Sequence, residues 1–396
     1  MNRLRKLADY DQSYWMDDLS RDLLRRGDLP RLMLESGLRG ITSNPAIFAQ
    51  AIVGSTAYDE QIAQGARGGR SALQIYEDLT SQDIRDACDA LLPVHQESGG
   101  VDGYVSLEVS PLLARDTAGS IAEGAHLAKL VARPNLMIKI PGTAEGLPAI
   151  EELLYRGIHV NVTLLFGIET YQAVTEAWLR ALERRHAEGK PVNNVASVAS
   201  FFVSRIDTLV DQLLQHRIRP DGGSALSPHP KTLQGKVAVA NAKLAYAAFR
   251  RLTGGDRWKA LAAAGARPQR LLWASTGTKN PAYSDVVYVE MLIGAQTVNT
   301  MPAPTAAAFA EHGKPGKNLT RAVPAARQVL KDLKALGIDL KRVAWQLEND
   351  GIQKFIEPYD ELLANIEAKR SALAGGQTHG QTHGQTHGQT HGQTHG

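Results

Sequence analysis

A single lysine interrupts the apolar stretch at residues 136–140, which reads Leu-Met-Ile-Lys-Ile. Because burying an unpaired ammonium costs several kcal/mol, Lys139 either lies on an exposed edge, pairs with a carboxylate or is kept neutral. Desolvation favours the neutral amine, which is a nucleophile and forms an imine with a carbonyl compound. An imine withdraws electrons from the adjacent carbon–carbon bond. The stretch therefore suggests aldol cleavage and condensation.

Aldol chemistry through an imine also needs a carboxylate that moves protons and a placed water that forms and hydrolyses the imine. Asp17 and Glu108 are available, since both lie near the C-terminal ends of strand-like segments. Asp17 could instead cap the following helix, a role for which Asp18 competes. Glu108 could serve only to neutralise Lys139. Neither carboxylate by itself decides between these interpretations.

Short β-branched segments alternate with amphipathic helical segments along most of the chain. We expect strands at residues 14–17, 40–43, 104–109, 136–140, 159–165, 195–203, 270–275 and 297–301. The clearest helical patterns are at residues 71–92, 168–187 and 231–252, and residues 322–373 read as further helices. Eight strand–helix units predict the α/β class, as a (β/α)8 TIM barrel with additional C-terminal helices. We assign residues 1–374 to one barrel domain with terminal helices.

Several of the expected strands carry polar residues on one face only. In the stretch VSLEVS one face carries valine and leucine, and the other carries Ser106, Glu108 and Ser110. Asn161 and Thr163 likewise share a face of a later strand. Because the outer face of a barrel strand packs under helices, the polar face is expected to line the lumen near the C-terminal mouth, where barrel enzymes place their sites.

The composition excludes several classes of function. The chain has 396 residues with 44 Lys+Arg, 41 Asp+Glu and a net charge of +3, and no basic block marks a nucleic-acid partner. Its single cysteine, Cys88, excludes an intrachain disulfide and a cysteine-based zinc site. No stretch of about 18 apolar residues suggests a membrane span, and the first residues lack an apolar secretory segment. We expect a cytoplasmic protein without a membrane partner.

The end of the sequence is a repeat, since residues 377–396 are five copies of Gln-Thr-His-Gly. A polar repeat of this kind cannot bury an apolar core, so we expect residues 375–396 to form a disordered tail. Weak divalent-metal binding by its histidines is the alternative interpretation.

Five stretches in order resemble the transaldolase family: ITSNPAIF, VSLEVSP, LMIKIPGTAEG, GIHVNVTLLF and SFFVSRID. A later stretch, WASTGTKNPAYSD, is most similar to the longer bacterial type. The resemblance covers most of the chain. It implies transfer of a dihydroxyacetone unit from sedoheptulose 7-phosphate to glyceraldehyde 3-phosphate through a lysine Schiff base, giving erythrose 4-phosphate and fructose 6-phosphate. It implies sugar-phosphate partners, a monomer or homodimer, and neither a metal nor an organic cofactor.

The resemblance also implies roles for individual residues. Lys139 corresponds to the Schiff-base lysine and Asp17, which follows an aliphatic strand residue, to the acid–base residue. Glu108 and Thr163 correspond to the residues that hold the catalytic water. The implied substrate-binding residues are Asn44, Asn161 and Ser200 for the dihydroxyacetone unit, Phe202 as a lining residue, and Arg205, Ser275 and Lys279 for phosphate. Shorter transaldolases carry an arginine soon after the serine, so the sequence departs from them at Lys279.

Each substrate-binding residue also has a plainer interpretation. Asn44 precedes a proline and could form a turn. Phe202 could belong to the barrel core, and Arg205 could pair with Asp207 or Asp211 along one helix.

Two other functions are compatible with a barrel that carries these residues. Fructose 6-phosphate aldolases of the same superfamily release the three-carbon unit, and they typically have glutamine and tyrosine where this chain has Glu108 and Phe202. These two residues therefore favour transfer over release. A non-catalytic sugar-phosphate-binding barrel is expected to lack at least one of the catalytic lysine, aspartate, glutamate and threonine, and all four are present here.

Overall fold

The strands follow one another around a closed parallel barrel in chain order, and the last strand pairs with the first. The computed structural model describes residues 2–218 and 228–378. The strands are β1 (Gln12–Met16), β2 (Leu38–Thr42), β3 (Tyr104–Glu108), β4 (Leu136–Pro141), β5 (Val160–Leu165), β6 (Ser197–Phe202), β7 (Arg270–Ala274) and β8 (Thr297–Met301). Parallel strands joined in sequence order by helices form a (β/α)8 barrel, so the predicted fold is confirmed.

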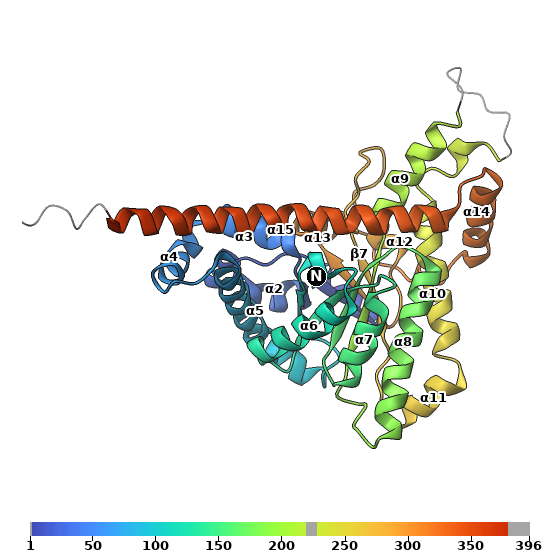
Figure 1. Ribbon diagram of the computed structural model, residues 1–396. Coiled ribbons are helices and arrows are strands. Elements are labelled where there is room, and N and C mark those ends of the chain that lie inside the picture. The colour runs from blue at the N-terminus through green and yellow to red at the C-terminus, as the bar shows by residue number, and fades with distance from the viewer. Residues whose placement is uncertain (1, 219–227, 379–396) are drawn as a thin grey trace, which may run out of the picture.

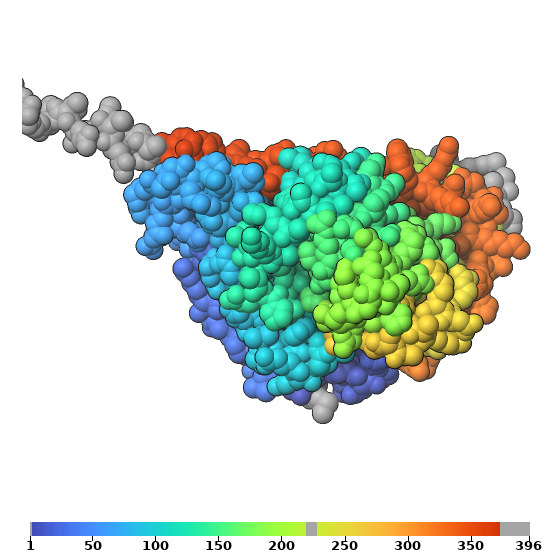
Figure 2. Space-filling model, turned by 60° about the horizontal axis from the view of Figure 1, so that its bottom comes forward, coloured from blue at the N-terminus to red at the C-terminus, as the bar shows by residue number. Residues whose placement is uncertain are grey.

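Helices surround the barrel on the outside (Figure 1). They are α1 (Arg21–Arg25), α2 (Asp28–Ser36), α3 (Pro45–Val53), α4 (Asp59–Arg67), α5 (Ala72–Glu97), α6 (Thr117–Val131), α7 (Gly146–Tyr155), α8 (Ile168–Ala187), α9 (Ser204–Gln215), α10 (Val237–Leu252), α11 (Asp256–Ala263), α12 (Val287–Met291), α13 (Ala303–His312), α14 (Val323–Ala335) and α15 (Leu340–Thr378). Short 3-10 helices are η1 (Arg5–Tyr10), η2 (Thr56–Tyr58), η3 (Pro111–Leu113) and η4 (Pro230–Thr232). Figure 2 shows the teal, green and yellow segments of the middle of the chain packed side by side on one face.

Several strands end earlier than the sequence predicts. Asp17 and Ser275 were expected inside strands but follow the last residues of β1 and β7. Asp17 still continues the ladder, because its backbone N–H donates to Met301 O at 2.9 Å. Asp17 and Ser275 thus lie just past the strand ends, at the C-terminal mouth of the barrel.

Two of the expected helices have different bounds. Helix α5 starts as expected, since Ser71 and Gln74 form a reciprocal capping box, but it continues past Pro93 to Glu97. Helix α10 starts at Val237 rather than at residue 231. The backbone of Gly235 has φ +68°, a left-handed conformation that a helix cannot include.

The N-terminal end of the barrel is closed by a buried polar cluster. Arg270 and Asp102 form an ion pair of 2.9 Å, and Ser13 and Trp15 donate to the same carboxylate at 2.7 and 3.2 Å. The indole of Trp15 lies against Gly40, where a Cβ atom would come within 2.5 Å of the ring. Only glycine fits there. The buried charges of Arg270 and Asp102 are thus paired with each other.

Helix α15 crosses the molecule as one long rod and passes over the C-terminal mouth (Figure 1). At Gly351 the helix comes so close to the barrel that a Cβ atom would lie 2.8 Å from a methyl carbon of Leu164. The helix runs to Thr378, into the segment for which a tail was expected, and residues 379–396 lie outside the described residues. No helix of the described residues is long and apolar enough to span a membrane.

Candidate active site

Lys139 lies in the middle of β4 with its side chain inside the barrel, and only 4% of the residue is exposed. Its Nζ atom lies 2.9 Å from Oε2 of Glu108 and donates a hydrogen bond to Ser43 O at 3.0 Å. Glu108 is its neighbour on β3, so the two side chains start from adjacent positions in the ladder. The structure thus contains the ion pair that the sequence left open as an alternative. This pairing makes burial of the amine tolerable.

Asp17 occupies the end of β1 and is hydrogen-bonded within the mouth. Its Oδ1 atom accepts from Oγ1 of Thr42 at 2.7 Å, and Thr42 contacts Thr300 at 2.8 Å. The N-cap of helix α1 is Ser20, which accepts from Leu23 N at 3.2 Å, so Asp17 does not cap this helix. Asp17 lines the same cavity as Lys139, and Asp18 does not. The geometry therefore favours Asp17 as the carboxylate of the site.

Burial changes the acidity of both carboxylates. It raises the pKa of Asp17, although the Lys139 ammonium and the Thr42 hydroxyl act in the opposite direction. It also raises the pKa of Glu108 against the lowering effect of Lys139. Both groups hold protons more readily than exposed carboxylates do, as acid–base catalysts must.

Glu108 and Thr163 keep polar atoms available beside the lysine. Glu108 Oε1 and Thr163 Oγ1 are buried and find no hydrogen-bond partner within the described part of the chain. Thr163 lies on β5, where its backbone is the register partner of Pro141 at the end of β4. Buried polar atoms of this kind are costly unless a bound molecule satisfies them.

The amide side chains form a polar line across the lumen. Asn161 Nδ2 donates to Ser106 Oγ at 3.0 Å, and Ser200 Oγ donates to Asn161 Oδ1 at 2.6 Å. Asn44 is the N-cap of α3, and its Oδ1 atom accepts from Ile47 N at 3.0 Å. Asn44 thus caps a helix from an extended conformation and does not form a turn, and the same residue also lines the cavity.

A basic region lies at the other side of the mouth. Arg205, at the start of α9, places its Cζ atom 5.5 Å from the ring centroid of Phe202. Its Nη1 atom is buried and has no hydrogen-bond partner among the described residues, and burial lowers the pKa of the guanidinium. Asp207 and Asp211, its alternative partners, are bonded to tyrosines instead. A desolvated and unpaired guanidinium is suited to bind an anion.

Ser275 lines the same cavity as Arg205 and has a strained conformation. Its φ is +55°, in the left-handed region that residues with a side chain rarely adopt, and its Oγ atom lies 3.0 Å from Ser204 Oγ. The conformation fixes Ser275 between β7 and the loop that carries Lys279.

Most of these groups line one cavity of about 160 Å³. Nine of the eleven residues expected from the sequence line it, namely Asp17, Asn44, Lys139, Thr163, Ser200, Phe202, Arg205, Ser275 and Lys279. Glu108 and Asn161 lie beneath its floor, in contact with Lys139 and Ser200. The described residues contain no cluster of three or more side chains suited to hold a metal ion.

Of the six lining residues that the sequence reasoning missed, Thr42, Thr300 and Phe355 lie beside Asp17 or Lys139. Thr42 and Thr300 bond to each other beside Asp17, and Thr42 stands within the quoted motif ITSNPAIF. Phe355, on α15, places its ring centroid 5.7 Å from Lys139 Nζ. No local pattern marks Phe355, because it reads as one more apolar residue of a long helix.

A buried lysine beside a glutamate, with an aspartate in the same cavity at the carboxyl mouth of a (β/α)8 barrel, is the arrangement of the lysine-dependent aldolases. The sequence model described as "Transaldolase/Fructose-6-phosphate aldolase" matches residues 14–366. The chain belongs to this family.

Similar proteins agree with this assignment over nearly their whole length. The chain is 46% identical over 370 residues to a transaldolase of Trichodesmium erythraeum, covering 93% of this chain and 97% of the relative. It is 48% identical over 366 residues to a transaldolase of Thiobacillus denitrificans, covering 92% and 100%. A transaldolase of Mycolicibacterium paratuberculosis is 48% identical over 362 residues, covering 91% and 95%.

Proposed function

We propose that this chain is a transaldolase that moves a dihydroxyacetone unit from sedoheptulose 7-phosphate to glyceraldehyde 3-phosphate and leaves erythrose 4-phosphate and fructose 6-phosphate. The observation that carries the proposal is the buried contact of 2.9 Å between Lys139 Nζ and Glu108 Oε2, with Asp17 in the same cavity. The names of its relatives support the same activity.

The first half of the proposed reaction forms an imine on Lys139. The proton that leaves the ammonium passes to Glu108, whose pKa burial has raised. The free amine then adds to the ketone carbon of the donor, and the carbinolamine loses water to give the imine. Glu108 returns its proton to the carbinolamine hydroxyl, which leaves as water. The unpartnered buried oxygens of Glu108 and Thr163 hold this water.

The second half breaks and remakes a carbon–carbon bond. Asp17 takes the proton of the C4 hydroxyl, the C3–C4 bond breaks, and the first aldose phosphate leaves. The imine receives the electron pair, and Asn161 and Ser200 hydrogen-bond the three-carbon unit that stays on Lys139. The unit then adds to the aldehyde carbon of the acceptor, Asp17 returns its proton to the new hydroxyl, and water hydrolyses the imine. Arg205, Ser275 and Lys279 hold the phosphate of each sugar in turn.

Release of the three-carbon unit to water is the second candidate function, because the family includes fructose-6-phosphate aldolases. Glu108 and Phe202 favour transfer. The relatives with the highest identity given above are all called transaldolases, which supports the same choice.

An assay of the full chain with fructose 6-phosphate and erythrose 4-phosphate tests the proposal. We expect sedoheptulose 7-phosphate and glyceraldehyde 3-phosphate, and little dihydroxyacetone when the acceptor is omitted. Lys139→Arg keeps the charge beside Glu108 but is expected to lower kcat at least about a thousandfold, since a guanidinium does not form the imine. Free dihydroxyacetone as the main product would support release instead.

We further propose that the protein works in the cytoplasm as a monomer or homodimer with sugar phosphates as its only required partners. The balanced charge and the absence of a basic block in the sequence support this proposal. Light scattering on the eluting protein tests the oligomeric state.

A further inference from the structure

Two tyrosine–aspartate pairs join helix α9 to the segment that follows β7. Tyr283 donates from its hydroxyl to Asp211 Oδ2 at 2.7 Å, and Tyr288 donates to Asp207 Oδ2 at 3.0 Å. Both aspartates belong to α9, whereas the tyrosines belong to the loop at residues 275–286 and to α12. The pairs lie outside the cavity, and the proposed reaction makes no use of them.

The second oxygen of each aspartate is bound as well. Asp207 Oδ1 accepts from Ala238 N at 2.7 Å, and Asp211 Oδ1 accepts from Gly235 N at 3.0 Å. Each carboxylate therefore fastens two separate segments of the chain to α9. Because all four oxygens have partners, the two carboxylates are not free to neutralise Arg205 on the same helix.

The ring of Tyr283 is held by shape in addition to its hydroxyl. Gly235 has φ +68°, and a Cβ atom at this position would lie 2.7 Å from Cζ of Tyr283. The ring thus packs directly on the glycine backbone. Removal of the hydroxyl alone leaves this packing in place, which makes Tyr283→Phe a clean substitution.

The loop fastened in this way carries Lys279, and α9 carries Arg205. Lys279 is exposed but lines the cavity. The two ends of the loop are attached elsewhere, since Thr276 Oγ1 donates to Thr300 O on β8 at 3.3 Å and Asp285 Oδ1 lies 2.9 Å from His312 Nε2 on α13. The bonds from Thr278 Oγ1 to Ser284 O at 2.9 Å and from Tyr283 N to Asn280 O at 3.1 Å are internal to the loop. In the middle of the loop, around Lys279, Tyr283 is the residue whose side chain bonds to α9. Fixing the backbone of a free segment costs roughly 1–2 kcal/mol per residue in conformational entropy. If the middle of the loop were not bonded to α9, Lys279 would therefore bind phosphate weakly.

We propose that Tyr283 and Tyr288 are positioning residues that hold the loop of Lys279 at a fixed distance from Arg205, so that both cations bind one phosphate group. The inference rests on the proposed function and deepens it. It assigns the selection of phosphorylated over unphosphorylated sugars to a tyrosine–aspartate clamp that touches no substrate.

Steady-state kinetics with matched acceptors tests the clamp. At saturating fructose 6-phosphate, Tyr283→Phe is expected to raise KM for erythrose 4-phosphate about fivefold, equivalent to the loss of about one hydrogen bond, with kcat within about twofold. KM for unphosphorylated erythrose is expected to stay unchanged. Asp211→Ala is expected to raise KM for erythrose 4-phosphate as well. The double variant is expected to raise this KM no further than Asp211→Ala alone, because both substitutions break the same hydrogen bond.

Tyr155→Phe is the matched control, since Tyr155 donates to Glu188 Oε2 at 2.7 Å in a tyrosine–carboxylate pair remote from the cavity. It should change neither KM for erythrose 4-phosphate nor KM for unphosphorylated erythrose. Thermal unfolding checks that each variant is folded, and if Asp211→Ala is not, Tyr283→Phe alone decides. An unchanged KM for erythrose 4-phosphate, or equal increases with both acceptors, would overturn the clamp. The proposed function itself fails only if the parent chain transfers no three-carbon unit.

Discussion

At the scale of single residues, the site depends on titratable groups that are buried in the barrel. Lys139, Glu108 and Asp17 are all removed from water, yet each has a partner that limits the cost. For Asp17 that partner is the hydroxyl of Thr42, which stabilises the ionised carboxylate and opposes the effect of burial. Together with the Lys139 ammonium, the Thr42 hydroxyl therefore opposes the rise in the pKa of Asp17 that burial causes.

Thr42→Val is expected to raise the pKa of Asp17 further, because the hydrogen bond that favours the charged form is lost. Asp17 must be ionised to act as a base, so kcat/KM falls as pH drops through its pKa, and this acid limb moves to higher pH in the variant. At neutral pH we expect a loss of up to about tenfold. The pH profile of kcat/KM is the measurement. Thr80→Val is the control, because it removes a buried hydroxyl that bonds only within α5 and should leave the pH profile unchanged. If the acid limb does not move in Thr42→Val, the role of Thr42 is refuted.

Ser275 has a positive φ at the edge of the cavity, and this conformation has a measurable cost. Both Ser275→Ala and Ser275→Gly remove the hydroxyl that contacts Ser204, but only glycine adopts the left-handed region without strain. We expect Ser275→Gly to be more stable than Ser275→Ala by about 1 kcal/mol in the free energy of unfolding by urea. Equal stabilities would mean that the backbone carries no strain there.

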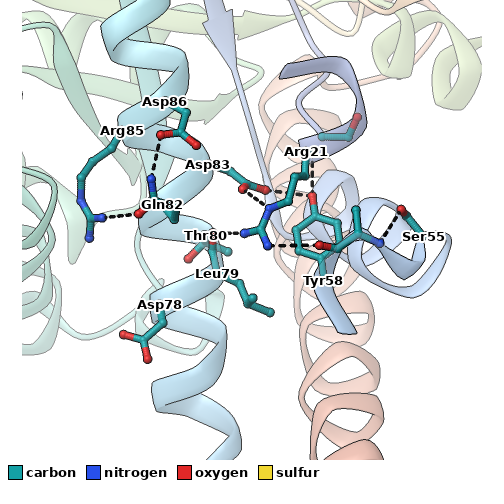
Figure 3. A network of polar contacts seen from close by, with 12 residues as sticks. Arg21, Ser55, Tyr58, Asp78, Leu79, Thr80, Gln82, Asp83, Arg85 and Asp86 are labelled. Carbon is teal, nitrogen blue, oxygen red and sulfur yellow. Dashed lines mark hydrogen bonds and ion pairs between the residues drawn. The ribbon is translucent and has the colours of Figure 1, made fainter. Parts of the chain in front are cut away.

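At the scale of elements, a buried network fixes the segment that follows Asp17 (Figure 3). Arg21 on α1 pairs with Asp83 on α5 at 2.8 Å, and Tyr58 donates to the other oxygen of Asp83 at 2.8 Å. The Arg21 guanidinium also lies 4.3 Å from the centroid of the Tyr58 ring. Three segments that are distant in sequence are thus joined beside the strand end that presents Asp17.

Asp83→Ala is expected to lower the free energy of unfolding by about 3–5 kcal/mol, because it leaves the Arg21 charge buried without its partner. Chemical denaturation measures the change. Glu35→Ala breaks the exposed pair with Arg31 and should cost no more than about 1 kcal/mol. If both substitutions had the same small effect, the network would not stabilise this segment.

Helix α15 covers the site at the C-terminal mouth of the barrel. Phe355 covers Lys139, so the imine proposed there is shielded from water on this side. We expect Phe355→Ala to lower stability by about 3 kcal/mol and to increase several-fold the ratio of free dihydroxyacetone to transferred product, because water reaches the imine.

Phe309→Ala serves as a control for the loss of stability, since Phe309 is fully buried on α13 but does not line the cavity. It should lower stability to a similar extent without changing the product ratio. A ratio that stays constant in Phe355→Ala would show that the phenylalanine does not exclude water.

At the scale of the whole molecule, local patterns were sufficient for the barrel but not for what covers it. Alternation of polar and apolar residues marked the lumen face of β3 and β5. The parallel topology explained why the polar side chains gather at one end of the barrel. Contacts between distant segments have no local signature. The position of Phe355 near Lys139 and the hydrogen bond from Tyr283 to Asp211 depend on how α15 and α9 pack. No short stretch of sequence predicts this packing.

The plainer interpretations of single residues were also decided by packing. Asp17 is not a helix cap because Ser20 takes that position. Within residues 2–218 and 228–378 Arg205 forms no ion pair, and Asp207 and Asp211 are bound by tyrosines. For Lys139 the ion pair left open as an alternative is present, and Asn44 is a helix N-cap that also lines the cavity. Sequence alone could not separate these cases, since each depends on a neighbour from another element.

Reductive trapping tests the central claim, which is that the amine of Lys139 captures a ketose inside the barrel. The full chain is treated with borohydride in the presence and absence of fructose 6-phosphate, and its peptides are mapped by mass spectrometry. A three-carbon adduct on the peptide of Lys139, formed only with the sugar and missing in Lys139→Arg, is the expected result. An adduct on another lysine, such as Lys243 or Lys279, or a protein that is active without any trapped adduct, would contradict the account.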